Sequence, residues 1–300
     1  GDDRAMKKVI IDTDVGGDID DALAVALALN SPELDVIGIT TVFENKLLRA
    51  KLAKKLLQVF NRSDIPVIKG VEKPIINDWD RSLIPPQVRA VREEIEVNEN
   101  INAVDFIVEK IMNSAEPVTL ITIGPLTNIA GAIIKEPGLK DKTRVYMMGG
   151  MYSQAFPEWN IYCDPEAGRV VFDSGIPITM VGLDVTLKCK LGKKSLDKIF
   201  DFNSERTNFL SELIRIWQED DESRFPILHD PLAVAALINP SLVRRESMHI
   251  KVETRGEFTR GVTVVADIPY EERKGDSSVD VSVDVDSDRF IQFFLERILK

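Results

Sequence analysis

A short stretch near the start of the chain, DTDVGGDIDD from Asp12 to Asp21, carries five carboxylates within ten residues. Two unit charges about 4 Å apart repel by roughly 1 kcal/mol in water and by about 4 kcal/mol near a protein surface. Asp20 and Asp21 open an expected helix, whose N-terminal dipole favours negative charge, but Asp12 and Asp14 precede the turn and are not explained by capping. The stretch therefore predicts that several carboxylates converge on a cation.

The donor types indicate which cation fits. Carboxylate oxygens without imidazole or thiolate suit a hard ion such as Ca²⁺ or Mg²⁺. The chain contains only two histidines, which excludes a His-rich zinc centre. An EF-hand is excluded because the twelfth position counted from Asp12 is Leu23 instead of glutamate. A GxGxxG dinucleotide loop is also absent, although Gly16 and Gly17 form the turn.

The elements that must position this site alternate between strand and helix. KKVIID predicts a short buried strand that leads into the acidic turn, and DDALAVALALN predicts the helix after it. Further apolar strands and helices follow in the same order up to IPITMVGLD at residues 176–184. This order predicts an α/β fold with a mainly parallel, Rossmann-like open sheet covered by helices on both faces. Ligands bind at the carboxyl ends of such strands, where Asp12 and Asp14 are expected to lie.

Three regions depart from this alternation. Residues 70–99 are long, charged and proline-bearing, which predicts a functional loop, and residues 191–225 predict extra helices that cap the sheet. Near the end, VTVVAD and SVDVSVDVD predict small C-terminal strands before a terminal helix. No repeat or low-complexity linker divides the chain, so we expect a single domain over residues 6–300. We expect residues 1–5, which precede Met6, to be a cloning remnant.

Charge and cysteine usage narrow the class of protein. The net charge of −11 argues against a sequence-independent nucleic-acid binder, which needs a basic surface, and against docking on anionic membranes. No apolar run reaches the roughly 18 residues of a membrane span. Cys163 and Cys189 lack a CxxC spacing, which predicts free thiols and a cytoplasmic location.

Seven segments follow one another along nearly the whole chain in a characteristic order. The first is the acidic stretch, a DxDxGxDxDD variant with two extra residues between the glycine and the aspartate pair. The other six are GITTVFEN (38–45), GPLTNIA (124–130), MGG (148–150), PEWNIYCDPEA (157–167), LHDPLAVA (228–235) and RGVTVVAD (260–267). In this order they resemble the inosine-uridine-type nucleoside hydrolases. The resemblance implies Ca²⁺-dependent hydrolysis of the N-glycosidic bond of ribonucleosides, which releases base and ribose by attack of a metal-bound water.

The resemblance also implies a role for each matching residue. Four residues would bind the Ca²⁺, the third through its backbone carbonyl: Asp14, Asp21, Ile123 and Asp230. Five residues would contact the substrate, mainly its ribose hydroxyls: Asp20, Asn45, Glu158, Asn160 and Asp230. Asp14 would be the general base on the attacking water, and Asp12 would support the site. Apart from the resemblance, we expect His229 to assist the leaving group, because it is the only histidine placed near the metal. Without the motif, Asn45 is equally well explained as a helix N-cap.

The resemblance weakens at the nucleobase. Many relatives carry a histidine in the first long loop, but GVEKPIINDWDRSLIPPQ at residues 70–87 has none. MYSQAF stands where GN usually follows MGG, and Glu44 replaces the glycine expected before Asn45. The missing histidine leaves open which base is recognised and how the leaving group is activated, and the other two departures leave open how the ribose 5′-hydroxyl is recognised. The candidates for base contacts are Trp79, Gln154, Arg224 and Phe225, together with Trp159.

Three other functions stay open at this stage. A relative could use the same grip on a diol to bind or cleave another sugar-containing ligand, or could bind a sugar without catalysis. IIDTDV also matches the DxDx(T/V) motif of haloacid-dehalogenase-like Mg²⁺ phosphatases, although the lysine and second acidic pair of that family do not stand out. Relatives of the nucleoside hydrolase type are commonly dimers or tetramers, so we expect this chain to form a homo-oligomer. We expect its binding partner to be a small substrate that contains ribose.

Overall fold

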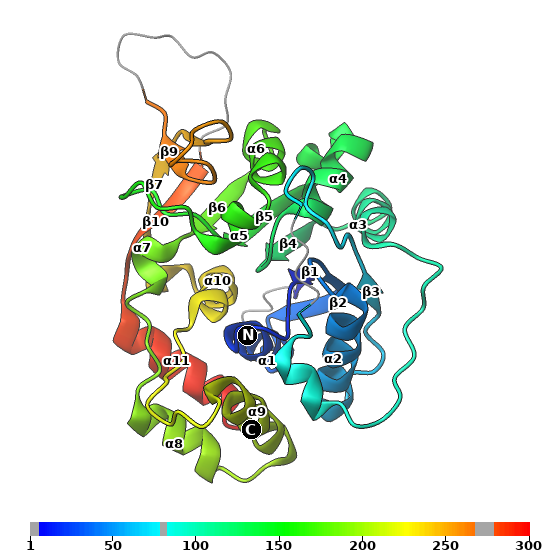
Figure 1. Cartoon of the computed structure of the whole chain (residues 1–300), viewed down its shortest axis with the longest axis vertical. Coiled ribbons are helices and arrows are strands. Elements are labelled where there is room, and N and C mark those ends of the chain that lie inside the picture. Colours follow the sequence, from blue (N-terminus) through cyan, green and yellow to red (C-terminus); the bar gives the residue numbers. More distant parts are fainter. Residues whose placement is uncertain (1–5, 79–82, 268–278) are drawn as a thin grey trace.

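The computed structural model describes residues 6–78, 83–267 and 279–300. The expected cloning remnant, residues 1–5, lies outside the described residues. An eight-stranded sheet crosses the molecule in the order β3-β2-β1-β4-β5-β6-β10-β7 (Figure 1). Its strands are β1 (Lys7–Thr13), β2 (Leu34–Thr41), β3 (Val67–Lys69), β4 (Val118–Thr122), β5 (Thr143–Met148), β6 (Ile178–Val181), β7 (Val243–Met248) and β10 (Val279–Val285). Every neighbouring pair is parallel except β10 and β7, which confirms the predicted α/β sheet.

The central strands β1, β4 and β6 are mostly buried because both faces of the sheet are covered, whereas the edge strand β7 is largely polar and exposed. Val9 and Ile11 of β1 pack into one hydrophobic core, and Ile10 between them packs into the other. The first core contains residues of α1 (Asp20–Leu29), α2 (Lys46–Val59), α8 (Lys193–Asp201), α9 (Glu205–Gln218), α10 (His229–Ile238) and α11 (Ser287–Ile298). The second contains residues of α3 (Ala103–Met112), α4 (Thr127–Lys135) and α6 (Pro165–Asp173). Alternating residues of one strand thus serve two cores, as expected for a strand buried on both faces.

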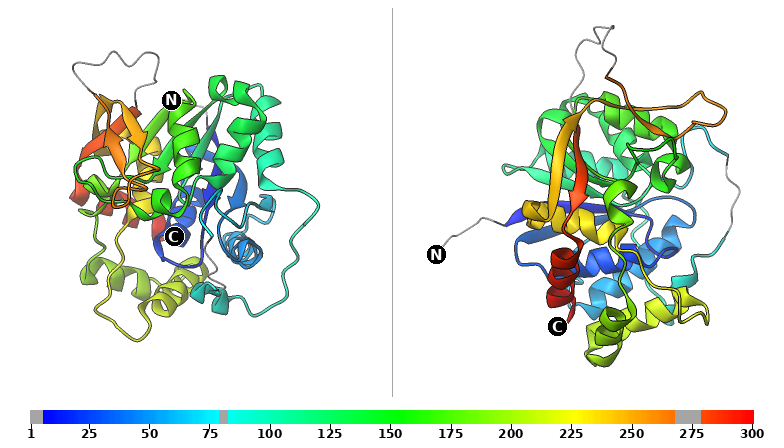
Figure 2. Two further views of the ribbon diagram at one scale, coloured as in Figure 1. Left: turned by 45° about the horizontal axis from the view of Figure 1, so that its top comes forward. Right: turned by 90° about the vertical axis from the view of Figure 1, so that its left-hand side faces the viewer.

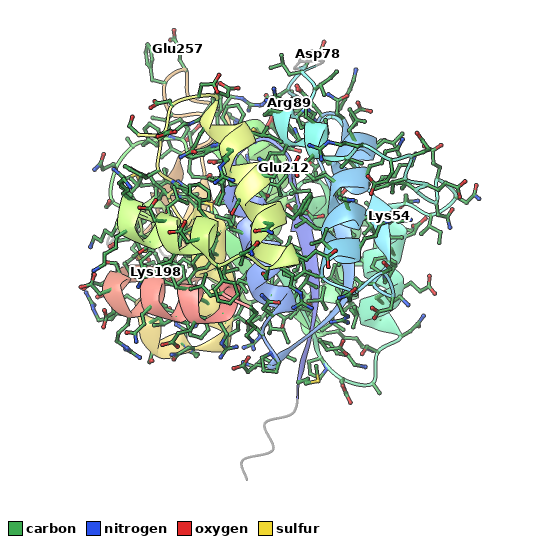
Figure 3. All side chains as sticks on the ribbon, turned by 90° about the horizontal axis from the view of Figure 1, so that it is seen from below. Lys54, Asp78, Arg89, Lys198, Glu212 and Glu257 are labelled. Atoms are coloured by element: carbon green, nitrogen blue, oxygen red, sulfur yellow. The ribbon has the colours of Figure 1, made fainter. Side chains whose placement is uncertain are left out.

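The region 191–225 forms the helices α8 and α9, as predicted, and α9 packs against a 3₁₀ helix at Pro86–Ala90. Seen from below, α9 with Glu212 lies beside the segment that carries Arg89 (Figure 3). The 3₁₀ helix belongs to the long loop 70–99, and it also packs against α2. The helical region 191–225 and the long loop 70–99, which both interrupt the alternation of strands and helices, therefore pack against each other.

The C-terminal region completes one edge of the main sheet. SVDVSVDVD forms β10, which inserts between β6 and β7 of the main sheet, whereas β9 (Thr263–Val265) pairs with β8 (Ile250–Val252) in a separate small sheet against α6 (Figure 2). The terminal helix α11 packs on α1 and α10, and Arg297 forms two hydrogen bonds of 2.6 and 2.7 Å with Glu33. Among the described helices, none combines the length and apolarity needed to cross a bilayer.

Candidate active site and metal centre

The acidic stretch forms the turn between the carboxyl end of β1 and the start of α1. Thr13, the last residue of β1, donates a hydrogen bond from Oγ1 to Asp21 Oδ2 (2.7 Å) and accepts one from the Val15 amide (3.0 Å). Gly16 has a φ of +127°, and a Cβ at this position would lie 2.8 Å from Pro85 Cβ. The turn therefore requires glycine at position 16, both for its backbone conformation and for the close approach of the long loop.

Two buried side chains hold this turn from outside. Gln87, from the 3₁₀ helix, donates through Nε2 to the carbonyls of Gly17 (2.8 Å) and Asp18 (3.0 Å). Arg49, from α2, donates through Nη1 to the carbonyls of Asp14 (2.5 Å) and Val15 (3.3 Å). The backbone groups of the turn are thereby satisfied, so its carboxylates are free to face inward.

Two carboxylates from the start of α1 and one from the start of α10 form a compact buried cluster where the two helix N-termini meet. One ligand atom from each of Asp20, Asp21 and Asp230 can be chosen so that all lie within 4.8 Å of one another. The Asp230 amide also donates to Asp20 Oδ2 (2.8 Å). Burial, followed by the neighbouring carboxylates, holds the pKa of all three well above its usual value. The dipoles of two helix N-termini favour negative charge at this point.

Asp14 completes the acidic side of the site. It lines the same cavity as Asp21, Asp230 and Ile123, the other residues for which the resemblance implied metal binding, but the compact cluster of Asp20, Asp21 and Asp230 does not include it. Burial raises the pKa of Asp14, and the positive charge of Arg49 opposes that rise. Asp20 belongs to the compact cluster as well, although the resemblance implied a ribose contact for it.

The donor set fits a hard divalent cation. Buried carboxylates that repel one another are stable as anions only when they are paired or coordinate a metal. Their oxygens, with a backbone carbonyl, are ligands that Ca²⁺ prefers. Asp12 lies behind the turn, where Oδ1 accepts hydrogen bonds from Thr40 Oγ1 (2.6 Å) and Asn128 Nδ2 (2.7 Å). Its buried Oδ2 has no hydrogen-bond partner within the described part of the chain, and burial raises the pKa of Asp12 to about 7.

The opposite wall of the cavity is built at the ends of β5 and α5 (Trp159–Cys163). Glu158 caps α5 and accepts hydrogen bonds from the amides of Gly150 (2.9 Å), Asn160 (2.8 Å) and Ile161 (3.2 Å). Burial raises the pKa of Glu158 to about 7. Asn160 is fixed by a hydrogen bond from Nδ2 to the Met148 carbonyl (3.1 Å). Both side chains are therefore held in place before any ligand binds.

His229 begins α10 and lines the cavity next to the acidic cluster. Its Nδ1 lies 2.7 Å from Oγ1 of Thr186, in the short helix α7 (Leu183–Thr186). Burial lowers the pKa of His229, which favours the neutral imidazole at neutral pH. The ring is thus oriented through Nδ1, and Nε2 has no hydrogen-bond partner among the residues that the structure describes.

The cavity between these walls has a volume of about 590 Å³, which is within the usual range for small-molecule sites. Its mouth is aromatic: Phe43, Phe156 and Trp159 line it, and the rings of Phe43 and Trp159 meet edge to face at 6.5 Å. A larger cavity of about 810 Å³ lies at the amino ends of the strands, away from the acidic cluster. We assign the chemistry to the smaller cavity because the buried titratable groups face it.

The structure places several expected site residues away from this cavity. Asn45 has a left-handed φ of 57° and donates from Nδ2 to the Leu83 carbonyl (2.6 Å), so it does not line the cavity. Gln154 is exposed, Arg224 donates to the Trp217 carbonyl (2.6 Å) and lies over the Trp217 ring, and Phe225 lies under Lys190. Trp79 lies outside the described residues.

Other cavity residues escaped the sequence analysis, notably Arg49, Phe43 and Phe156. One signal for Arg49 was available: it lies on the buried stripe of α2 with Ala53 and Leu56, where a charged residue breaks the apolar pattern. The aromatic residues had no such signal, because their approach to the cavity depends on loop conformation.

Known proteins are similar to this chain in both sequence and fold. The family described as "Inosine-uridine preferring nucleoside hydrolase" matches residues 9–292. The chain is 36% identical over 312 aligned positions to the pyrimidine-specific ribonucleoside hydrolase RihA of Escherichia coli O7:K1, with 97% of each chain covered. It superposes on the purine-preferring ribonucleoside hydrolase from Gardnerella vaginalis with a TM-score of 0.85, 32% identity and 98% of each chain covered.

A plant nucleoside hydrolase, PpNRh1, gives a TM-score of 0.86 at 28% identity, with 98% of this chain and 99% of that chain covered. Sequence and fold therefore agree over nearly the whole length of the protein. The chain belongs to the inosine-uridine preferring nucleoside hydrolase family and is a hydrolase that acts on N-glycosyl compounds.

Proposed function

We propose that the protein is a Ca²⁺-dependent ribonucleoside hydrolase that releases a free base and ribose. The observation that carries this proposal is one cavity in which Asp14, Asp21 and Asp230 face Glu158 and Asn160. Asp14, Asp21, Asp230 and the Ile123 carbonyl would hold the ion. A bound Ca²⁺ would supply a grip on the vicinal diol of ribose and would make a nearby water more acidic.

Side chains of the cavity would activate the attacking water and bind the ribose. Asp14 accepts the proton of the attacking water as a general base, a role that typically contributes 10²- to 10⁴-fold in rate. Asp20, Glu158 and Asn160 hold ribose hydroxyls through hydrogen bonds that strengthen as positive charge develops on the sugar. Because water attacks directly, without a protein nucleophile, the anomeric carbon is inverted.

His229 and the aromatic mouth are assigned to the leaving group. Thr186 fixes the imidazole through Nδ1, so the other ring nitrogen meets the departing base. Phe43, Phe156 and Trp159 offer ring faces and edges on which a base can stack. This assignment moves the base contacts from Gln154, Arg224 and Phe225 to residues that line the cavity.

The experiment is a reducing-sugar assay on purine, pyrimidine and nicotinamide ribosides, with and without a chelator. We expect turnover of at least one riboside, loss of turnover in chelator, and recovery on adding Ca²⁺. Asp14→Asn should lower kcat by about 10²- to 10⁴-fold, whereas Asp201→Asn, an exposed carboxylate at the end of α8, should leave it unchanged. Tight ribose binding without turnover would instead support a sugar-binding protein.

We further propose a single domain over residues 6–300, a cytoplasmic location and a homodimer or homotetramer. The single domain is supported by β10, which joins the sheet that β1 begins. The cytoplasmic location is supported by Cys163 and Cys189, which are both buried and are not joined in a disulfide. The oligomer rests on the resemblance to the family, and sedimentation of the purified protein tests it.

A further inference from the structure

The β2–α2 junction sends an unexpected side chain to the cavity. The family resemblance implied that Asn45 reaches the ribose from this junction, but its amide is turned away onto the Leu83 carbonyl. Arg49, one helical turn later, lines the cavity instead, although only 7% of the residue is exposed. This junction therefore contributes a guanidinium to the cavity in place of the expected carboxamide.

The backbone holds two of the three guanidinium nitrogens of Arg49. Nε donates to the Glu44 carbonyl (2.6 Å), and Nη1 donates to the carbonyls of Asp14 and Val15. The guanidinium carbon also lies 5.8 Å from the centre of the Phe43 ring, on the aromatic side of the cavity. These contacts fix the plane of the guanidinium before substrate binds.

The third nitrogen is left for a ligand. Within residues 6–78, 83–267 and 279–300, no acceptor is hydrogen-bonded to Nη2. A purely structural clamp on the turn explains Nε and Nη1, but it does not explain a charged donor that is left over at a cavity wall. Arginine presents its donors in a rigid planar fork, so the contacts that fix Nε and Nη1 also fix the direction in which Nη2 can donate.

We propose that Arg49 binds substrate, with Nη2 donating a hydrogen bond to a ribose hydroxyl in the role expected of Asn45. This inference rests on the proposed ribonucleoside hydrolase function. The contact belongs to a hydroxyl and not to the reacting carbon, because a guanidinium beside that carbon would oppose the positive charge that develops there. The same side chain positions Asp14 by holding its carbonyl.

The test compares Arg49→Met with a matched control, Arg206→Met. Arg206 also donates to a backbone carbonyl, that of Phe60, and lies over a phenylalanine ring, but it does not line the cavity. The substrates are the ribonucleoside that the wild type hydrolyses fastest and its 2′-, 3′- and 5′-deoxy analogues. We expect Arg49→Met to lower kcat/KM on the parent by about 10- to 100-fold, and Arg206→Met to change it less than threefold.

The analogues separate contact from folding. If Arg49 holds one hydroxyl, removing that hydroxyl lowers the wild-type rate by at least tenfold more than it lowers the Arg49→Met rate. Equal losses in both proteins for all three analogues would overturn the inference. If Arg49→Met does not fold, Arg49→Lys replaces it in the same comparison. One ammonium group cannot donate to three carbonyls and a hydroxyl at once. Equal losses in the wild type and Arg49→Lys would also overturn the inference. A wild type that hydrolyses no riboside would refute the proposed function itself, and the inference with it.

Discussion

Thr186 and His229 show how one residue acts through another. Thr186 lies 2.7 Å from His229 Nδ1 and is itself buried without lining the cavity, so its hydroxyl can affect catalysis only by orienting the ring. We predict that Thr186→Val lowers kcat by roughly tenfold, the value of about one hydrogen bond. In a protein that already carries His229→Ala, Thr186→Val should have no further effect on kcat. Losses that add in the double variant would contradict this role.

The aromatic mouth of the cavity makes a different prediction. Trp159 is 45% exposed and its ring packs edge to face with that of Phe43, so we expect it to contact substrate without supporting the core. We predict that Trp159→Ala raises KM by about 5- to 20-fold, in line with about 1–2 kcal/mol for a stacking aromatic ring. The melting temperature should change little, and Phe202→Ala, an exposed aromatic residue at the end of α8, provides the control. An unchanged KM would show that the base does not stack on Trp159.

At the scale of elements, the turn between β1 and α1 depends on the long loop that packs against it. Gly16 has a left-handed φ and meets Pro85, whereas a Cβ on Gly17 would meet nothing within 4 Å. We predict that Gly16→Ala lowers the free energy of unfolding by about 1–3 kcal/mol, since it combines backbone strain with a steric clash. Gly17→Ala should change it by less than about 0.5 kcal/mol. Urea denaturation measures both, and equal stabilities would contradict the described packing.

The sequence predicted those elements that carry strong apolar patterns and missed those that do not. β1, β2, β4 and β5 were predicted, as were the helices α1, α2 and α4, because their apolar runs are long enough to bury, as the structure confirms. The short elements α5 and β8 went unrecognised, since three to five residues show no periodicity. The role of β10 was missed as well, because its partners β6 and β7 are distant in sequence.

The same reasoning explains which site residues the sequence placed in the cavity. Asp14, Asp21, Glu158 and Asn160 lie at the ends of strands or at helix N-termini, where the element fixes the direction of the side chain. The directions of Gln154 and Arg224 depend on loop conformation, which local patterns do not determine. Asn45 occupies the N-cap position of α2, but its left-handed backbone leaves its side chain without a capping hydrogen bond. Asn45 and Arg49 illustrate the difference. The left-handed backbone of Asn45 turns its side chain away from the cavity, and Arg49 lines the cavity instead.

At the scale of the whole molecule, the buried carboxyls link stability to pH and to metal. In the metal-free protein, burial raises the pKa of Asp12 and Glu158 to about 7, from ordinary values of 3.8 and 4.5. The folded state therefore holds protons that the unfolded chain releases, so this contribution is present at low pH and is lost as the pH rises through about 7. We predict that the chelated protein melts at progressively lower temperature between pH 5 and about pH 8.

Saturating Ca²⁺ should raise the melting temperature most at the upper end of this range, where the carboxylates are ionised. A ligand at 100 times its Kd stabilises the folded state by about 2.7 kcal/mol. Differential scanning calorimetry across this pH range, with and without chelator, measures both effects. If the metal-free protein instead gained stability as the pH rises, buried Asp12 and Glu158 could not be protonated in its folded state.

The central claim is that carboxylates from α1 and α10 meet with Asp14 around one divalent ion that the reaction needs. Calorimetric titration of Ca²⁺ into the metal-stripped protein, with riboside turnover followed in the same samples, tests it most directly. We predict one ion per chain, turnover that rises with occupancy, and loss of both in Asp21→Asn and Asp230→Asn. Full turnover by the stripped protein, or unchanged Ca²⁺ binding in both variants, would contradict the account.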